Sequence, residues 1–130
     1  MFNYMRKYLR IICRSGKQQA SELSGGNQQK VVFAKWLAAN AKILILDEPT
    51  SGVDVNAKEE MRMIIRNATA SGASVLLISS EIEELSLTAD RIVIMIDGQL
   101  GRSLPAGFSA TEIRTSIQED VHMIRKEPVL

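Results

Sequence analysis

The chain of 130 residues has few of the features that mark specialised classes of protein. It has one cysteine, Cys13, so no disulfide can form within it, and this favours a reducing compartment. No apolar run approaches the roughly 20 residues that cross a bilayer. Arg10 and Arg14 interrupt the apolar residues near the N-terminus, so we expect no secretory signal there.

An excess of charge of either sign is also missing. The formal net charge is +1 at pH 7, so the overall balance indicates neither a nucleic-acid partner nor an anionic membrane. The chain is 45% hydrophobic and 24% charged, which is ordinary for one globular domain or part of one. Residues 1–20 are basic, with no acid before Glu22. We expect a solvated, partly helical lead-in there, with a nucleic-acid or lipid patch as the alternative.

Hydrophobic periodicity predicts helices and strands in alternation. The predicted elements are a helix over 24–40, a strand over 43–46, a helix over 56–71, a strand over 74–79, a short helix from 81, strands over 91–96 and 99–104, and a last helix from 109. The order strand, helix, strand, helix, strand is typical of an α/β fold with a parallel sheet and crossover helices. Asp97-Gly98 predicts a hairpin turn, which would add an antiparallel edge to that sheet.

Capping residues predict where the helices begin and end. They are Ser24 as an N-cap, Asn56 with Glu59 as a capping box, Gly72 as a helix end, and Ser109 with Glu112 as a second capping box. The last helix carries an apolar face of Ile113, Ile117, Val121 and Ile124.

The sequence Leu-Ser-Gly-Gly-Asn-Gln-Gln at residues 23–29 stands where the first helix begins. Adjacent glycines let backbone N–H groups come close to a ligand, and a helix N-terminus favours an anion. Ser24 adds a hydroxyl donor. A bare Ser-Gly-Gly indicates only a loop before a helix, so the functional interpretation depends on all seven residues and the helix that follows.

The apolar strand over 43–46 ends in two acids, Asp47 and Glu48. Ligands of open α/β sheets bind at the carboxyl edge of the strands, which is where these two side chains are predicted to lie. The alternative is that two solvated acids simply end a strand. Pro49 and Thr50, which follow, favour the functional interpretation.

In this order and spacing, the two motifs resemble the signature and Walker B motifs of ABC transporter ATP-binding proteins. The Asn-Gln-Gln ending resembles the carbohydrate-importer branch, of the ribose, xylose and galactose type. The resemblance implies the C-terminal part of a P-loop NTPase domain, with parallel strands, crossover helices and a terminal β-hairpin. It divides the chain into a lead-in over 1–20, a partial nucleotide-binding domain over 21–126 and a tail over 127–130.

The resemblance also implies roles for individual residues. Asp47 would hold Mg²⁺ through water, and Glu48 would be the catalytic residue that orients the attacking water. The residues expected to contact the γ-phosphate of ATP bound by the opposing domain, in trans, are Ser24, Gly25, Gly26 and Gln28. Residues 51–54 resemble the D-loop, which communicates between the two domains, although a simple turn is the alternative.

Most ABC ATPases carry a histidine that contacts the γ-phosphate, and this sequence has Ser80 at that position. The second domain of fused sugar-importer ATPases resembles the chain in this replacement too. Serine offers no imidazole, so the catalytic site is expected to be weak. Ser80 could instead form a capping box with Glu83. We expect the one histidine, His122, to lie at the surface of the last helix.

The phosphate-binding Walker A loop, Gly-x-x-x-x-Gly-Lys-Ser/Thr, is missing from the chain. Gly16-Lys17 is the one Gly-Lys pair, but Ile11 stands where the first glycine is needed and Gln18 where the hydroxyl is needed. We therefore predict that the isolated chain has no ATPase activity. Without the strands that carry this loop, exposed sheet edges and a half-covered apolar face are expected, and with them self-association.

Two hypotheses of function follow. In the first, the chain is part of an ATP-binding subunit that couples ATP binding and hydrolysis to sugar uptake. The implied partners are a second nucleotide-binding domain, membrane permease subunits and, indirectly, a sugar-binding protein, but no nucleic acid. The implied location is cytoplasmic, on the inner face of the cell membrane. In the second hypothesis, the chain is a non-catalytic docking or regulatory module that pairs with an intact nucleotide-binding domain.

Overall fold

The computed structural model describes residues 1–124, so the predicted tail over 127–130 lies outside the described residues. The chain divides into two compact units, Met1–Ile78 and Ser79–Leu130. None of the helices in the described part has the length and apolar character needed to span a membrane.

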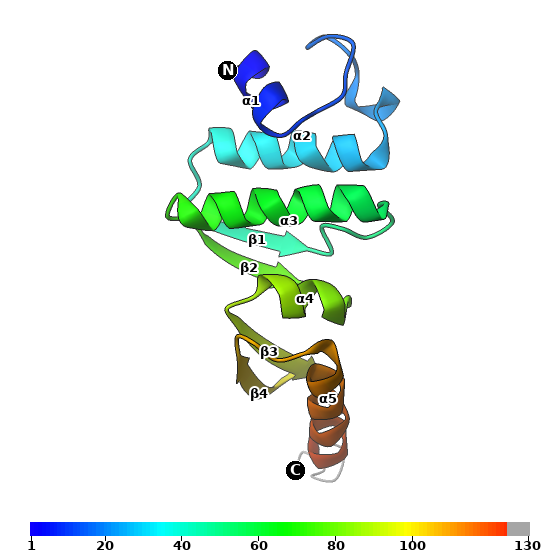
Figure 1. The fold of residues 1–130 in the computed structure, drawn as a ribbon, viewed down its shortest axis with the longest axis vertical. Helices are drawn as coiled ribbons and strands as arrows, with labels where there is room; N and C mark the ends of the chain where they lie inside the picture. Colours follow the sequence, from blue (N-terminus) through cyan, green and yellow to red (C-terminus); the bar gives the residue numbers. More distant parts are fainter. Residues whose placement is uncertain (125–130) are drawn as a thin grey trace. The chain divides into compact units, whose positions relative to one another are not determined.

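Unit 1 is built from four helical elements and two strands (Figure 1). They are α1 (Phe2–Tyr8), the 3₁₀ helix η1 (Ala20–Glu22), α2 (Gly25–Ala38), β1 (Ile43–Asp47), α3 (Val55–Ala70) and β2 (Ser74–Ile78). The strands are parallel, in register from Ile43 opposite Ser74 to Asp47 opposite Ile78. Helix α3 is the crossover between them, and it lies between α2 and the strand pair (Figure 1). The predicted parallel α/β arrangement is therefore confirmed for these two strands.

The core of unit 1 is formed where α2, α3 and one face of the strand pair meet. Its buried members are Leu9, Ile11, Phe33, Met61, Ile64 and Ile65, with Leu46, Val75 and Leu77 packed against them. Sequence periodicity predicts the apolar face of α3 correctly. It does not reveal the burial of Leu9 and Ile11, which lie among the basic residues of the lead-in. The side chains of Arg6, Lys7, Arg10 and Arg14 are exposed, as expected.

Helix α3 begins two residues earlier than the predicted capping box of Asn56 and Glu59 implies. Its N-cap is Asp54, whose Oδ1 accepts the Ala57 N–H at 2.9 Å. Asp54 has the extended backbone of an N-cap, whereas Asn56 already lies inside the helix, so the Asn56 prediction is wrong. Gly72 follows the helix with φ of +92° and ends it as predicted.

Unit 2 contains α4 (Ile82–Thr88), β3 (Arg91–Ile96), β4 (Gln99–Pro105) and α5 (Ala110–Ile124). Strands β3 and β4 are antiparallel around Asp97 and Gly98, which have φ of +50° and +79°. A two-residue turn with two positive φ angles matches the right-handed twist of a hairpin. The core beneath comprises Ile92, Ile94, Ile96, Leu104 and Ile113.

The hairpin differs from its prediction in one respect. It was expected to form an antiparallel edge of the parallel sheet, but β3 and β4 form a two-stranded sheet of their own. Alternation of apolar and polar residues predicts which side chains share a face of a strand, but it does not predict which strands pair with it. A hairpin partner is two residues away, whereas a parallel partner must come from a distant segment.

The two helices of unit 2 begin differently. At α5, the Glu112 carboxylate accepts both the N–H and the Oγ–H of Ser109, at 2.8 and 2.6 Å, which confirms the predicted capping box. At α4, the N-cap is Glu81, not Ser80, so the capping box of Ser80 and Glu83 is wrong. Glu83 instead forms an ion pair with Arg114 of α5, which lowers the pKa of that glutamate.

Candidate functional site

The N-terminus of α2 carries the Ser-Gly-Gly sequence. Ser24 has an extended backbone and is the N-cap by position, as predicted. Its side chain caps no backbone N–H, and its Oγ instead accepts a hydrogen bond from Asn27 Nδ2 at 2.8 Å. Since a hydroxyl can accept one bond and donate another, that contact leaves the Ser24 hydrogen for a ligand.

The two glycines of this motif have different surroundings. A Cβ added at Gly25 would meet no atom within 4 Å, so the space beside this residue is open. A Cβ at Gly26 would lie 3.2 Å from Ala57 Cβ in the first turn of α3, so Gly26 lets the two helices approach closely. The open side at Gly25 leaves room for an anion against the first N–H groups of α2.

Asn27 holds the start of α2 in place. Its Oδ1 accepts the Ile12 N–H at 2.8 Å, while its Nδ2 donates to Ser24. Gln28, predicted as a phosphate contact, donates from Nε2 to Leu23 O at 2.9 Å and is exposed. Sequence reasoning missed the role of Asn27. Its position three residues after an N-cap serine was the available signal.

The two predicted acids lie together at the carboxyl end of β1, in the same unit as the Ser-Gly-Gly motif. Asp47 is the last residue of the strand and is exposed. Glu48 follows with φ of +45°, and its N–H donates to Ile78 O at the end of β2, at 2.9 Å. A left-handed backbone at a residue other than glycine costs about 1–3 kcal/mol and tends to occur at functional sites. Here it turns the chain sharply away from the sheet.

The segment after Glu48 anchors this turn. Pro49 and Thr50 are buried, and Thr50 is fully enclosed. The following residues 51–54 form a turn with Gly52 at φ of +72° and end in the N-cap Asp54. The structure thus gives the local conformation of the predicted D-loop, while its role between two domains stays a prediction.

The chemistry of this site suits a cation only with help from outside the chain. Among residues 1–124, no group of three or more His, Cys, Asp or Glu side chains could hold a metal ion. Mg²⁺ keeps several waters and is typically bound by one or two carboxylates together with substrate phosphates. A single exposed Asp47 fits that mode of binding and does not fit a metal site made by the protein alone.

Ser80 belongs to unit 2, where it is exposed and precedes the N-cap of α4. Asp47 and Glu48 belong to unit 1, so its predicted place in their site stays a prediction. His122 is exposed on α5, as expected.

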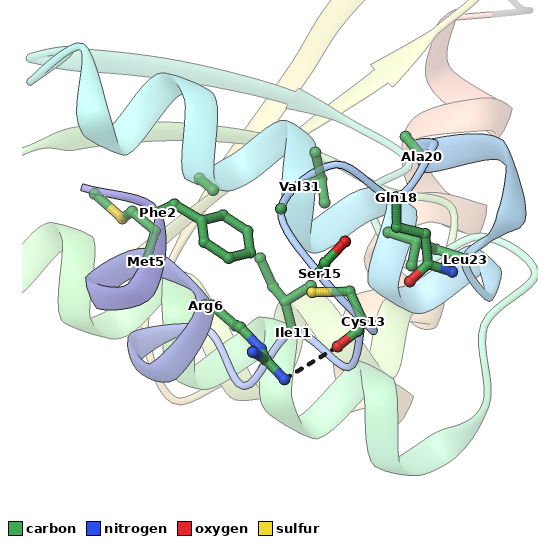
Figure 2. A pocket seen from close by; sticks show the side chains of 12 residues that line it. Phe2, Met5, Arg6, Ile11, Cys13, Ser15, Gln18, Ala20, Leu23 and Val31 are labelled. Carbon is green, nitrogen blue, oxygen red and sulfur yellow. Dashed lines mark hydrogen bonds between the residues drawn. The ribbon is translucent and has the colours of Figure 1, made fainter.

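The Gly16-Lys17 pair lies in a loop of unit 1, where Gly16 lines a small cavity. The cavity measures about 200 Å³ and is lined mainly by apolar side chains of α1, the following loop and α2. Arg6 lines it too, but its Nη2 donates to Cys13 O at 3.0 Å (Figure 2). The element that follows Lys17 is the short 3₁₀ helix η1, and α2 begins only at Gly25, so the pair does not lead into an α-helix as a phosphate loop does.

Comparison with known proteins identifies the family. The family model described as ABC transporter matches residues 5–51, which contain both motifs. The ribose import ATP-binding protein of Corynebacterium glutamicum is 52% identical over 98 residues, covering 75% of this chain. The chain belongs to the ABC transporter ATP-binding family. A ribose import ATP-binding protein of Streptomyces coelicolor is 54% identical over 81% of this chain. An uncharacterized ABC transporter ATP-binding protein of Escherichia coli is 45% identical over 79% of this chain.

The chain spans about one fifth of these relatives, namely 19% of the first and 20% of the other two. Solved structures agree on the fold. A nucleotide-free ATP-binding cassette superposes with a TM-score of 0.77 at 21% identity, covering 94% of this chain and 47% of the other. A dimeric bacterial ABC transporter cassette superposes with a TM-score of 0.70 at 27% identity, and the match covers 82% of this chain and 46% of the cassette. The described chain therefore corresponds to about half of a cassette.

Proposed function

We propose that the chain is part of the ATP-binding subunit of an ABC-type sugar importer, which couples ATP binding and hydrolysis to carbohydrate uptake. The observation that carries the proposal is the presence in one unit of an open helix N-terminus at Ser24 and Gly25 and an acidic strand end at Asp47 and Glu48. The names of the relatives supply the substrate class, a ribose-type sugar.

At the α2 N-terminus, the chain would bind the γ-phosphate of ATP held by an opposing domain. The Ser24 hydroxyl and the first N–H groups of α2 are the donors, and Asn27 orients that hydroxyl. Gly25 gives access, whereas Gly26 contributes through its close packing on Ala57. Gln28 would act at the edge of the same contact.

At the end of β1, the chain would serve the nucleotide of its own domain. Glu48 orients and deprotonates a water, and its backbone, fixed by the bond to Ile78 O, sets the direction of the side chain. Asp47 would hold Mg²⁺ through water, and that ion would neutralise charge on the phosphates. Ser80 would stand at the γ-phosphate without an imidazole. The missing Walker A loop must come from outside these residues.

The partners in this proposal are a second nucleotide-binding domain and membrane permease subunits, with a sugar-binding protein acting through the permease. The chain would sit on the cytoplasmic face of the membrane. The second candidate function, a non-catalytic module that docks onto an intact nucleotide-binding domain, is favoured by the missing Walker A loop and by an exposed apolar sheet face.

A chimera tests the catalytic proposal. Residues 21–124 replace the matching segment of the C. glutamicum ribose import protein, and phosphate release from MgATP is measured. We expect turnover that falls at least about 100-fold with Glu48→Gln, as for loss of a general base. Glu59→Gln, an exposed carboxylate of α3 that pairs with Arg62, is the matched control and should keep full activity. Equal turnover in all three proteins would refute the role of Glu48 and favour the docking module.

A further inference from the structure

Residues 1–17 hold an excess of positive charge that the rest of the chain does not share. They contain five basic residues and no acid, whereas residues 18–130 hold 11 basic against 15 acidic residues, a net charge of −4. Such an asymmetry within one chain is typical of proteins that contact a nucleic acid or a membrane. We call the five residues the lead-in cations: Arg6, Lys7, Arg10, Arg14 and Lys17.

The structure leaves the charge of the lead-in cations uncompensated. All five side chains are exposed. None of them forms an ion pair with a carboxylate of residues 1–124, where the basic partners in ion pairs are Lys30, Arg62, Arg102 and Arg114. An anionic surface outside the chain would therefore be attracted without competition from these carboxylates.

Helix α1 places aromatic rings beside these cations. One side of the helix faces unit 1, because Phe2 and Met5 line the small cavity there (Figure 2). Tyr4 and Tyr8, one turn apart, are 65% and 41% exposed, and their rings stack with centroids 5.9 Å apart. Lys7 follows Tyr4 by three residues and so lies on the same side of the helix. The exposed side of α1 is thus both aromatic and basic.

The lead-in is a fixed part of unit 1 and not a loose tail. The Ile12 N–H donates to Asn27 Oδ1 of α2 at 2.8 Å, and Lys30 Nζ donates to Arg10 O at 3.4 Å. Leu9 is buried in the core of the unit. The Ile12 side chain, by contrast, is 77% exposed. A large aliphatic side chain therefore stands in the open between two of the lead-in cations.

This combination of side chains favours a lipid surface over a nucleic acid. Basic clusters bind anionic headgroups, and tyrosine is enriched where a membrane meets water. A single-stranded nucleic acid would stack its bases on aromatic ring faces. The rings of Tyr4 and Tyr8 stack on each other, with 6° between their planes, so each covers one face of the other. The exposed Ile12 suits acyl chains and offers nothing to a phosphate.

We propose that the lead-in binds the surface of a membrane that contains anionic lipids. The lead-in cations contact the headgroup phosphates, and Tyr4, Tyr8 and Ile12 lie at the boundary with the acyl chains. The chain makes this contact itself, without a permease and without nucleotide, so the inference goes beyond the proposed function and does not depend on it.

Cosedimentation of the purified 130-residue chain with lipid vesicles tests the proposal. The vesicles are phosphatidylcholine alone, or phosphatidylcholine with about one third phosphatidylglycerol. We expect binding to the anionic vesicles that is at least about 10-fold stronger than to the neutral ones and weakens as salt is added. The triple variant Lys7→Gln, Arg14→Gln and Lys17→Gln should bind at least about 10-fold more weakly, because three of the cations are lost.

A second triple variant is the matched control. Lys35→Gln, Lys42→Gln and Arg91→Gln remove the same charge from exposed positions outside the lead-in, and binding should stay within about 2-fold. Tyr4→Ser keeps every charge and should weaken binding about 3-fold or more, since the ring no longer enters the interface. Circular dichroism of each variant shows that the fold is kept.

Three outcomes would overturn the proposal: no preference for anionic vesicles, equal losses in the two triple variants, or full binding by Tyr4→Ser. Poly-uridine RNA is the competing probe. If the chain bound this RNA through the lead-in cations and did not bind the vesicles, the surface would be a nucleic-acid site instead. ATP hydrolysis by the chimera does not enter this test, so either proposal can fail while the other stands.

Discussion

Units 1 and 2 reach their structures by different routes. In unit 2, a two-residue turn pairs β3 with β4, and a capping box starts α5. In unit 1, the pairing of β1 with β2 depends on the crossover through α3, and the apolar side chains on one face of this strand pair are exposed. The comparison teaches that local signals suffice for a hairpin, whereas a parallel pair needs residues from elsewhere.

Polar contacts sharpen the same contrast. Unit 2 contains a buried carboxylate, Asp120, which accepts the backbone N–H of Arg102 at 2.8 Å and its Nε at 2.6 Å. Glu119 takes a third bond from the same arginine. Unit 1 instead buries Lys30, which pairs with Glu60 of α3, thirty residues away. The contacts of Arg102 and Asp120 join β4 to α5, which follows it in the sequence. The pair of Lys30 and Glu60 joins α2 to α3, across the intervening strand β1.

The largest expected effect comes from removing one core side chain in each unit. Met61 in unit 1 and Ile113 in unit 2 are each 1% exposed, so replacing either with alanine should cost about 2–5 kcal/mol. If the units are separate cores, Met61→Ala lowers amide protection in residues 1–78 and Ile113→Ala in residues 79–124. Hydrogen exchange by mass spectrometry measures this. Loss of protection throughout the chain in both variants would mean one cooperative core.

Two glycine-to-alanine substitutions should differ in how much they lower the free energy of unfolding. A Cβ at Gly101 would overlap Asp120 Oδ2, so Gly101→Ala pushes the carboxylate off the Arg102 N–H and should cost about 1–3 kcal/mol. Gly25→Ala enters open space in a helix and should change stability by less than about 1 kcal/mol. Urea unfolding of the two variants checks this. Equal losses would contradict the close approach of β4 to α5.

The corrected start of α3 gives a smaller effect. Asp54→Ala removes the acceptor of the Ala57 N–H and should cost about 1 kcal/mol. Asn56→Ala is the control and should be nearly neutral, because Asn56 lies inside the helix. Thermal unfolding followed by circular dichroism separates the two variants. A larger loss for Asn56→Ala would restore the capping box that the sequence predicts.

The smallest effect is a pH dependence confined to unit 2. The backbone N–H of Arg102, with the guanidinium beside it, lowers the pKa of Asp120 from its ordinary 3.8. Ser109 lowers that of Glu112 from 4.5. Their stabilising contribution is therefore complete above those ordinary values and is lost as pH falls through the lowered ones. Amide protection of α5 should drop below about pH 4.

Asp120→Asn is the control for this pH dependence. It removes one of the carboxylates of unit 2 whose lowered pKa makes stability depend on pH. The protection of α5 should therefore be lower overall and change less between pH 5 and pH 2. An unchanged slope would mean that Asp120 does not contribute to acid unfolding.

The sequence predicts those features that depend on neighbours along the chain. The 3.6-residue period identifies the buried face of α3, Asp97-Gly98 identifies the hairpin, and Ser109 with Glu112 identifies the start of α5. The two motifs of the candidate site are also read directly from the sequence, because their residues are contiguous.

Features that depend on distant residues were not predictable in this way. Leu9 and Ile11 are buried although Arg10 stands between them. Leu9 caps the end of α1 and Arg10 has a left-handed φ of +51°, so the chain turns there, and hydropathy along the sequence does not report this turn. Lys30 is buried because Glu60 faces it, and no local pattern reports that pair. The different surroundings of Gly25 and Gly26 depend on the packing of α3, so two adjacent glycines look identical in the sequence.

The most direct test of the central claim is a calorimetric titration of MgATP, first into the chain alone and then into the chimera that carries residues 21–124 in the C. glutamicum ribose import protein. The account predicts no heat of binding for the chain alone, since it lacks a Walker A loop, and binding by the chimera. Binding to the chain alone, lost in Asp47→Asn, would contradict it, because these residues would then form a complete nucleotide site by themselves.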